Sequence, residues 1–353
     1  MIQRCKNCHL PGNYPGISFG SDSQGLCNFC QKETVKFQYP GIEVVKKQIE
    51  DILAQSDPNR KYDCIVGASG GRDSSYLLYV AKEVLNLRVL ALSIKHDFMT
   101  PQAQKNIKTI TEKLRIDVEY IENDVLNKGS RKSIKVWAKK PDAAMSVTFC
   151  TGCRYGLRKL IPQYAREHNV PILLIGDVPF EKMDYRVDLL CDGGKINMAN
   201  KLMGYAKRLI KNPSYVSTIY DQCRDYVSWQ KTEAGLEKPV KITPFYYMEW
   251  NKQTVISTIE KLGWGYDDKF NSSWRSDCYI NMLRQFVYKK MVGFNDLDVY
   301  YGQLVREKEM TLPEALEHIE TEGKFDEDVV RKIFKDFYDI DYDKIKDKME
   351  MKE

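Results

Sequence analysis

The chain has 353 residues, of which 43% are hydrophobic and 29% are charged, and its net charge is +5. This length predicts two or three domains and is ample for an enzyme. No apolar run is long enough to span a bilayer, and the first residues lack a signal-peptide core, so we expect a cytoplasmic protein without a membrane anchor. The small net charge suits an anionic substrate and does not by itself indicate nucleic-acid binding.

The first 35 residues carry two C-x2-C pairs. Cys5 with Cys8 and Cys27 with Cys30 flank a stretch rich in Gly, Pro, Ser and Asn. So short a segment cannot bury a core, whereas four thiolates can close a tetrahedral Zn²⁺ site that holds the fold. We therefore predict a structural zinc knuckle with four cysteine ligands over residues 1–35, with four unligated cysteines or a redox pair as the alternatives.

The next region, residues 36–245, alternates strands and helices. After a polar helix at 43–55, we predict strands at 63–68, 89–94, 118–121 and 172–175, and helices at 74–85, 103–114 and 157–167. Alternation with continuously apolar strands predicts an α/β fold with a doubly wound parallel sheet. In such a sheet the ligand lies beyond the carboxyl ends of the strands.

A Gly-rich turn follows the first of these strands. Ser69, Gly70, Gly71, Asp73 and Ser74 spell S-G-G-x-D-S directly before a helix. Adjacent glycines let the backbone approach a ligand, and the N–H groups at the start of the helix point at its anionic end. The motif is neither a Walker A loop nor the G-x-G-x-x-G dinucleotide fingerprint. It predicts a phosphate-binding loop, with an ordinary capped turn as the alternative.

A third C-x2-C pair, Cys150 and Cys153, lies at the start of a predicted helix, before Arg154 and Arg158, which we consider as ligands of an anionic group. The pair could be a redox couple, half of a second zinc site, or two ligands of an iron–sulfur cluster. A third ligand would separate these interpretations. Among Cys191, Cys223 and Cys278 we favour Cys278, because it stands in a polar, charged stretch just before a helix.

The remaining segments are less regular. We interpret residues 180–240 as a partly helical insertion near the active site, followed by a short strand at 242–245. A C-terminal helical region is predicted over 246–353, with helices at 252–262, 276–291 and 312–320.

The S-G-G-x-D-S loop after a strand resembles that of the PP-loop ATP pyrophosphatases, which split ATP into AMP and pyrophosphate. The resemblance implies adenylation of a substrate oxygen, followed by displacement of AMP by a nitrogen or sulfur nucleophile. The opening R-C-x-x-C-x-x-P knuckle, the C-x-x-C in the middle of the sequence and the late P-F-Y-Y-M-E-W-N and L-G-W segments look like the N-acetyl sugar amidotransferases of bacterial surface-polysaccharide (lipopolysaccharide) synthesis.

That family implies conversion of the acetamido group of a nucleotide-linked sugar to an acetamidino group. ATP would adenylate the amide oxygen, and ammonia would displace AMP. The sequence shows no glutaminase residues of its own, so the resemblance implies a separate glutaminase and an ammonia-channel partner. A homodimer is left open.

The resemblance also suggests roles for residues. Ser69, Gly70, Gly71 and Ser74 would hold the phosphates of ATP, and Arg72 would neutralise the departing pyrophosphate. Asp73 would cap the helix or help to hold Mg²⁺, and Asp177 would bind Mg²⁺ or the acceptor or be only a turn residue. Adenine and ribose would lie near Ala68, Ser93 and Lys95.

The sequence departs from the family at three places, and one of them, the lack of an aromatic residue and a His around the pair Cys150 and Cys153, bears on the acceptor site. Arg72 stands where many relatives have Lys, and Asp177 stands where members often have Gly-Glu. The alternative function is a PP-loop sulfur transferase acting on tRNA or a small molecule, with a [4Fe-4S] cluster held by Cys150, Cys153 and Cys278. Nucleic acid is expected as a partner only under that alternative. A non-enzymatic binding module is a third interpretation.

Overall fold

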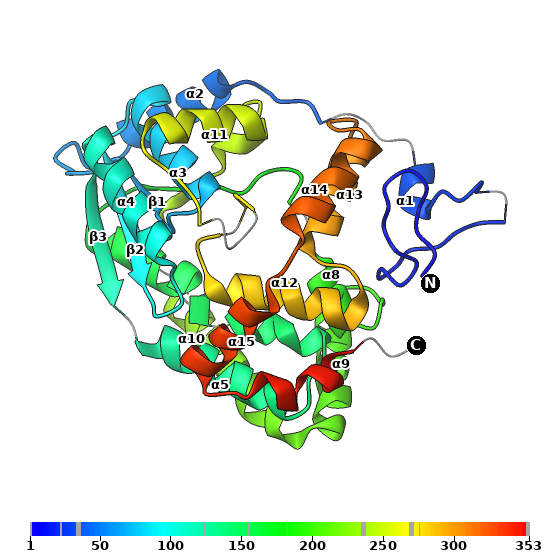
Figure 1. Cartoon of the computed structure of the whole chain (residues 1–353). Helices are drawn as coiled ribbons and strands as arrows, with labels where there is room; N and C mark the ends of the chain where they lie inside the picture. The colour runs from blue at the N-terminus through cyan, green and yellow to red at the C-terminus, as the bar shows by residue number, and fades with distance from the viewer. Residues whose placement is uncertain are drawn as a thin grey trace.

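The computed structural model describes residues 2–21, 23–32, 37–122, 124–150, 152–153, 156–181, 183–233, 238–267, 272–274 and 276–350. Five strands form one sheet in the order β3-β2-β1-β4-β5, and every neighbouring pair is parallel. They are β1 (Cys64–Gly67), β2 (Val89–Lys95), β3 (Asp117–Glu122), β4 (Ile172–Leu174) and β5 (Val240–Ile242). The predicted parallel α/β sheet is confirmed (Figure 1).

Helices cover both faces of this sheet because successive side chains of β1 point to opposite sides. Cys64 and Val66 pack into the larger core with α3 (Arg72–Tyr79) and α4 (Pro101–Leu114). Ile65 faces the other way, into a smaller core that contains Ile161 and Ala165 of α7 (Ile161–Glu167). Helices α2 (Ile42–Ala54) and α11 (Lys252–Lys261) also contribute to the larger core.

Some predicted boundaries were wrong. The last strand occupies 240–242 rather than 242–245, because Pro244 begins a 3-10 turn and cannot donate to a strand ladder. The helix predicted at 74–85 starts at Arg72, and its last turn, Val80–Val84, is π-helical. Helix α5 (Asp124–Lys139) was not predicted, because it carries many lysines and serines, but it buries Ile134 and Trp137.

A second core joins α5 to the C-terminal helices. Trp137 packs against Phe149 and Phe334, with ring centroids 5.1 and 6.4 Å apart. The elements around it are the 3-10 helix Ala144–Cys150, α12 (Tyr279–Val292) and α15 (Glu327–Tyr338). The helical C-terminal region is thus present, and it extends the α/β domain below the sheet in Figure 1.

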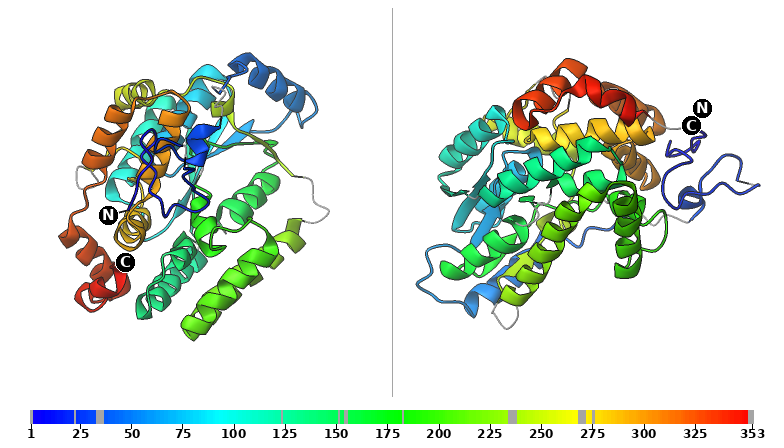
Figure 2. Two further views of the ribbon diagram at one scale, coloured as in Figure 1. Left: turned by 90° about the vertical axis from the view of Figure 1, so that its right-hand side faces the viewer. Right: turned by 90° about the horizontal axis from the view of Figure 1, so that it is seen from below.

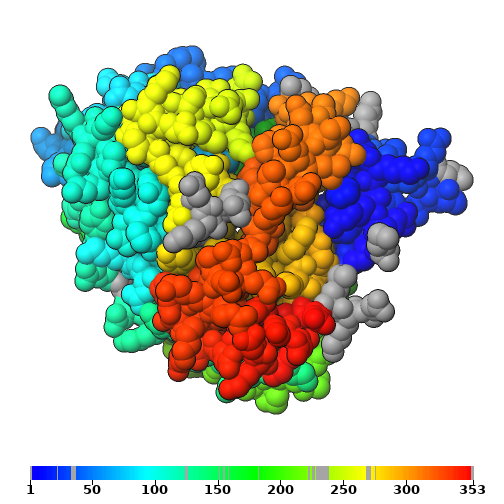
Figure 3. Space-filling view, in the orientation of Figure 1, coloured from blue at the N-terminus to red at the C-terminus, as the bar shows by residue number. Residues whose placement is uncertain are grey.

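The N-terminal knuckle, with its short helix α1 (Asn28–Gln31), lies against α13 (Asp296–Arg306) and beside α14 (Leu312–Glu322), on the far side from β3. Figure 3 shows this segment in contact with the orange C-terminal helices. Residues 180–240 contain α8 (Tyr185–Leu190), α9 (Met198–Lys211) and α10 (Val216–Glu233). The domain boundaries stay predictions. Within the described ranges, every helix is too short or too polar to cross a membrane.

Candidate active site and metal centre

The loop between β1 and α3 turns sharply at Gly70. Its φ is +77°, in the left-handed region that favours glycine, and a Cβ there would stand 2.2 Å from the carbonyl oxygen of Ala103. Gly71 is the N-cap of α3, and Arg72 is its first residue. The loop is therefore pressed against α4, and its shape depends on the first glycine of the motif.

Two side chains fix the carbonyl of Gly70. Asn106 Nδ2 donates to it at 2.9 Å, and Trp264 Nε1 donates at 3.1 Å. Asn106 also donates to the carbonyl of Gly265 at 2.7 Å, so a single buried amide links the loop to the segment after α11. With this carbonyl held on the α4 side, the unpaired N–H groups at the start of α3 are the groups that can meet an anion.

The two serines of the motif face each other. Ser69 Oγ lies 3.1 Å from Ser74 Oγ and accepts the N–H of Gly71 at 3.3 Å. Ser74 Oγ is also within 3.1 Å of the carbonyl of Gly71. Both hydroxyls are thus positioned on the loop by short-range bonds, as the predicted phosphate-binding role requires, and that role stays a prediction.

The side chain of Arg72 lies inside the protein. Its Nε and Nη2 donate to the two carboxylate oxygens of Asp73 at 3.0 and 3.1 Å, and Nη2 lies 3.6 Å from Glu181. The guanidinium is 4.7 Å from the centre of the Trp250 ring and is 1% exposed. The predicted contact of Arg72 with pyrophosphate stays untested, and this position makes Arg72 an anchor for the first turn of α3. Both carboxylate oxygens of Asp73 therefore accept hydrogen bonds from Arg72, and the predicted role of Asp73 with Mg²⁺ stays a prediction.

The predicted adenosine-binding residues lie at the ends of β1 and β2. Ala68 and Ser93 are buried, and Ser93 Oγ has no hydrogen-bond partner among the described residues. Lys95 is exposed and pairs with Glu122 at 2.8 Å. Beside Lys95 opens a cleft of about 840 Å³ at the ends of β2 and β3. Its lining combines three lysines with three acids, Lys95, Lys105, Lys108, Asp97, Glu122 and Asp124, together with His96, Pro101, Tyr120 and Asn127.

Asp177 is exposed just after β4, in the position expected for a residue at the carboxyl end of a strand. The preceding Gly176 lies against the start of α3, since a Cβ there would be 3.7 Å from the carbonyl oxygen of Asp73. The pKa of Tyr246 is raised mainly by burial and to a smaller extent by the negative charge of Asp177, which lies at the β4 end of the site. Its role with Mg²⁺ or the acceptor stays a prediction.

Asp277 was not predicted as a site residue. Residues 276–279 are held against the segment 98–100 after β2 by backbone hydrogen bonds, and we call this contact the clip. Thr100 N–H donates to the carbonyl of Asp277 at 3.0 Å, Tyr279 N–H donates to that of Phe98 at 2.9 Å, and Met99 and Cys278 form an isolated antiparallel bridge. This clip places the carboxylate of Asp277 beside Gly71. The pairing joins distant parts of the sequence, so no local signal could have revealed it.

The same clip places Cys278 near the third C-x2-C pair. Burial raises the pKa of the Cys278 thiol well above its usual value, and the nearby charges of Asp277, Cys150 and Cys153 raise it further. Arg284 Nη1 donates to Cys150 Sγ at 3.1 Å from α12, and its side chain is buried. The structure therefore brings Cys150 and Cys153 near enough to Cys278 for their charges to affect its pKa.

The trio does not form a compact ligand set of the kind that binds one ion. Among the described residues, only the N-terminal cysteines bring three or more ligand atoms within 4.8 Å of one another. Arg154 and Arg275 lie outside the described residues, as does the side chain of Arg158.

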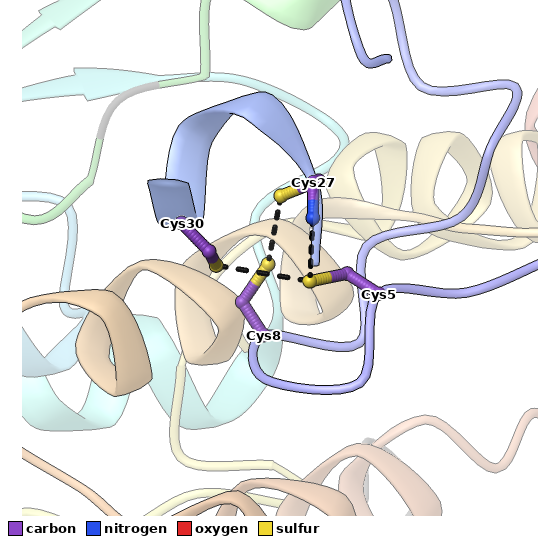
Figure 4. Close-up of side chains that lie close together, drawn as sticks. All are labelled: Cys5, Cys8, Cys27 and Cys30. Carbon is purple, nitrogen blue, oxygen red and sulfur yellow. Dashed lines mark hydrogen bonds between the residues drawn. The ribbon is translucent and has the colours of Figure 1, made fainter. Parts of the chain in front are cut away.

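The four N-terminal cysteines converge as predicted (Figure 4). Cys5 and Cys30 have their sulfurs 3.7 Å apart, as do Cys8 and Cys27, and all four sulfurs lie within 4.8 Å of one another. Four thiolates around one Zn²⁺ at about 2.3 Å would stand roughly 3.8 Å apart. The residues present therefore fit a single tetrahedral metal ion.

The knuckle is docked on the C-terminal helices. A Cβ on Gly302 of α13 would stand 2.8 Å from the carbonyl oxygen of Cys8, and Arg4 pairs with Asp298 at 3.2 Å. Cys5, Cys8 and Cys27 are buried together with Tyr288 and Phe294, among others. The metal centre thus supports the interface between the N-terminus and α12–α13 and lies apart from the Gly70 loop.

The sheet order, the loop and the helix that it caps define a fold of the PP-loop ATP pyrophosphatase type. In agreement, residues 41–139 match the family model of NAD synthase. This match covers the first three strands and the loop, and it supports an ATP-pyrophosphatase enzyme without specifying the acceptor.

Over 86 residues the protein is 31% identical to an uncharacterized protein of Methanocaldococcus jannaschii, a match that covers 24% of this chain and 31% of that one. The match thus spans about a third of the length of this curated relative.

Three solved structures are similar at low identity. NMN synthetase from Francisella tularensis has a TM-score of 0.39 at 13% identity, covering 79% of this chain and 91% of its own. The U34-tRNA thiolase NcsA from Methanococcus maripaludis, with its [4Fe-4S] cluster, has a TM-score of 0.35 at 16% identity, covering 96% and 99%. NH3-dependent NAD synthetase from Campylobacter jejuni has a TM-score of 0.31 at 14% identity, covering 63% of this chain and 93% of its own. These TM-scores are too low to bear on function.

Proposed function

We propose that this protein is an ATP-dependent transferase that adenylates an oxygen of its acceptor and releases pyrophosphate. The observation that carries the proposal is the loop at Gly70, whose carbonyl is held by Asn106 and Trp264 while the start of α3 is left to an anion. Positioned N–H groups there would stabilise the charge that develops on the leaving pyrophosphate. Ser69 and Ser74 would add hydroxyl donors.

As acceptor we propose the acetamido group of a nucleotide-linked N-acetyl sugar. Its amide oxygen would attack the α-phosphorus of ATP, and ammonia supplied by a separate glutaminase would then displace AMP to leave an acetamidino sugar. The proposal rests on the resemblance of the sequence motifs to those of the N-acetyl sugar amidotransferases along most of the sequence. The cleft beside Lys95 offers the ring of Tyr120 and the side chains of Lys105 and Lys108 to a nucleotide part, alongside the acids Asp97, Glu122 and Asp124.

Oxygen transfer tests this reaction. With ATP, ammonium and a panel of nucleotide-linked N-acetyl sugars labelled with ¹⁸O in the acetamido group, the label should appear in AMP, one atom per pyrophosphate released. Ser69→Ala should abolish release, whereas Ser257→Ala, on the exposed face of α11, should not. Acceptor-independent pyrophosphate release, or AMP free of label, would refute adenylation of the acetamido oxygen.

A second candidate is sulfur transfer. It is favoured by the position of Cys278 beside Asp277, next to the loop, and of Cys150 under the guanidinium of Arg284. Cys150, Cys153 and Cys278 would hold a [4Fe-4S] cluster with one iron left without a protein ligand, a centre that could bind a transferable sulfur.

Metal analysis separates the two candidates. After anaerobic purification, the amidotransferase proposal expects one zinc and no iron per protein molecule, since the four N-terminal thiols fit a single ion. Iron that is lost in Cys278→Ala but retained in Cys223→Ala, with zinc unchanged in both, would favour sulfur transfer instead.

A further inference from the structure

Exposed apolar side chains gather on two consecutive helices of the insertion, α9 and α10. Of the thirteen large hydrophobic residues that are exposed in the described ranges, eight lie between residues 196 and 227. Ile210 is 83% exposed and Tyr220 is 63% exposed. We call this surface the α9–α10 face; its members on the helices are Met198, Leu202, Met203, Ile210, Val216, Tyr220 and Val227.

On α9, the opposite side of the helix is the one that packs on the protein. Gly204 faces Leu190 so closely that a Cβ would collide with its carbonyl. Arg208 donates to the carbonyls of Leu189 and Leu190 at 2.9 and 3.1 Å. Because a helix turns 100° per residue, the side chains at 198, 202 and 210 fall on one side and point away from this contact.

On α10 the exposed residues follow the spacing of a helix-packing seam. Val216, Tyr220, Cys223 and Val227 are all exposed and are spaced four, three and four residues apart. This 4-3-4 spacing places them along one stripe of the helix, as in helices that pair by knobs-into-holes packing. In the right-hand view of Figure 2, α10 (yellow-green) lies away from the red α15.

The exposed apolar area on and beside these two helices is large. Eight large side chains that each leave on the order of 100 Å² exposed sum to about 800 Å², comparable with the share of one partner in a stable interface. Interfaces this apolar belong to permanent partners, and homodimer interfaces are more apolar than transient ones.

We propose that the α9–α10 face binds the same face of a second copy around a two-fold axis, with the α10 stripes in contact, so that the protein is a homodimer. A two-fold interface requires a self-complementary patch, and paired apolar stripes meet this condition. At the edge of the face, the charge of Lys207 is offset within the protomer by Asp192 at 2.6 Å, while Arg208 on the packed side pairs with Asp142 at 3.8 Å as well as with Asp192 at 2.7 Å. The proposal is independent of the reaction that the enzyme catalyses.

Sedimentation velocity of the full-length protein at tens of micromolar tests the proposal. We expect a particle of twice the protomer mass of 41.1 kDa, and Ile210→Glu and Tyr220→Glu should each weaken the dimer at least tenfold while leaving the far-UV circular-dichroism spectrum of the folded protein unchanged. Val44→Glu is the matched control, since Val44 is 47% exposed on α2, away from the face. A monomeric wild-type protein, or a dimer unchanged by both substitutions, would overturn the proposal.

Crosslinking gives a second readout. A bifunctional maleimide should join two copies through Cys223, and Cys223→Ser should abolish that product while leaving the dimer intact. A dimer whose crosslinking does not depend on Cys223, or a different protein crosslinked through Cys223 in place of a second copy, would contradict pairing of the α10 stripes.

Discussion

The carboxylate of Asp277 faces Gly71, since a Cβ on Gly71 would stand 3.2 Å from Asp277 Cγ and 3.3 Å from Oδ2. The clip between residues 276–279 and 98–100 fixes this relationship, because the carbonyls of Asp277 and Ser276 both accept bonds from Thr100, the N-cap of α4. An acid at this place repels the phosphates of a bound nucleotide unless a cation lies between them.

Asp277→Asn should therefore raise the Mg²⁺ concentration needed for half-maximal pyrophosphate release by about tenfold, the factor that corresponds to ~1.4 kcal/mol. The measurement is a Mg²⁺ titration at saturating ATP and acceptor. Asp57→Asn, in an exposed turn after α2, should leave the titration unchanged. An unaltered Mg²⁺ requirement in Asp277→Asn would remove the carboxylate from metal binding.

Gly70→Ala should disrupt the loop more than its size suggests. The new Cβ would be forced into the carbonyl of Ala103 at a φ of +77°, and the left-handed conformation alone costs about 1–2 kcal/mol for a residue with a side chain. We expect the free energy of unfolding to fall by more than about 2 kcal/mol and nucleotide binding to be lost. Urea denaturation and ATP titration measure the two effects. Gly20→Ala, where a Cβ would meet nothing within 4 Å, should change neither.

The loop and the knuckle were predictable because their signals are local. The spacing of Cys5, Cys8, Cys27 and Cys30 sets the ligand geometry, and S-G-G-x-D-S marks a turn whose backbone demands follow from its own glycines. Arg72 could be named from the motif, but the direction of its side chain could not, because Glu181 and Trp250 reach it from distant segments. Asp277 was missed for the same reason, since only tertiary pairing brings it to Gly71.

Cys8→Ser should remove the metal and loosen the contact between the N-terminus and α13. Structural zinc contributes about 10–16 kcal/mol to the folding of isolated zinc-finger peptides, so three remaining thiolates should not keep the knuckle folded at neutral pH. Zinc content should fall from one per protein molecule to none, and amide hydrogens of α13 near Gly302 should exchange faster. Cys191→Ser, a buried cysteine outside the cluster, should retain the zinc. Full zinc occupancy in Cys8→Ser would show that Cys8 is not a ligand.

Glu322 makes stability depend on pH. Burial alone would raise the pKa of Glu322, but the charge of Lys252 and hydrogen bonds from Lys252, Ser272 and Tyr301 outweigh it, so the pKa lies below the usual 4.5 of a glutamate. Because the folded-state pKa is lowered, the stability that this carboxylate adds is present above pH 4.5 and is lost as the pH falls through the folded-state pKa.

Glu322→Gln leaves the charge of Lys252 without its partner, so it should lower the free energy of unfolding at pH 7 by about 3 kcal/mol. The difference from wild type should shrink as the pH is lowered below 4.5, which urea denaturation at several pH values measures. Glu320→Gln, whose exposed carboxylate is 4.0 Å from Lys324 just beyond the end of the same helix, should change the stability by less than about 1 kcal/mol at either pH. A constant gap between wild type and Glu322→Gln across this pH range would show that the ionised carboxylate is not the stabilising form.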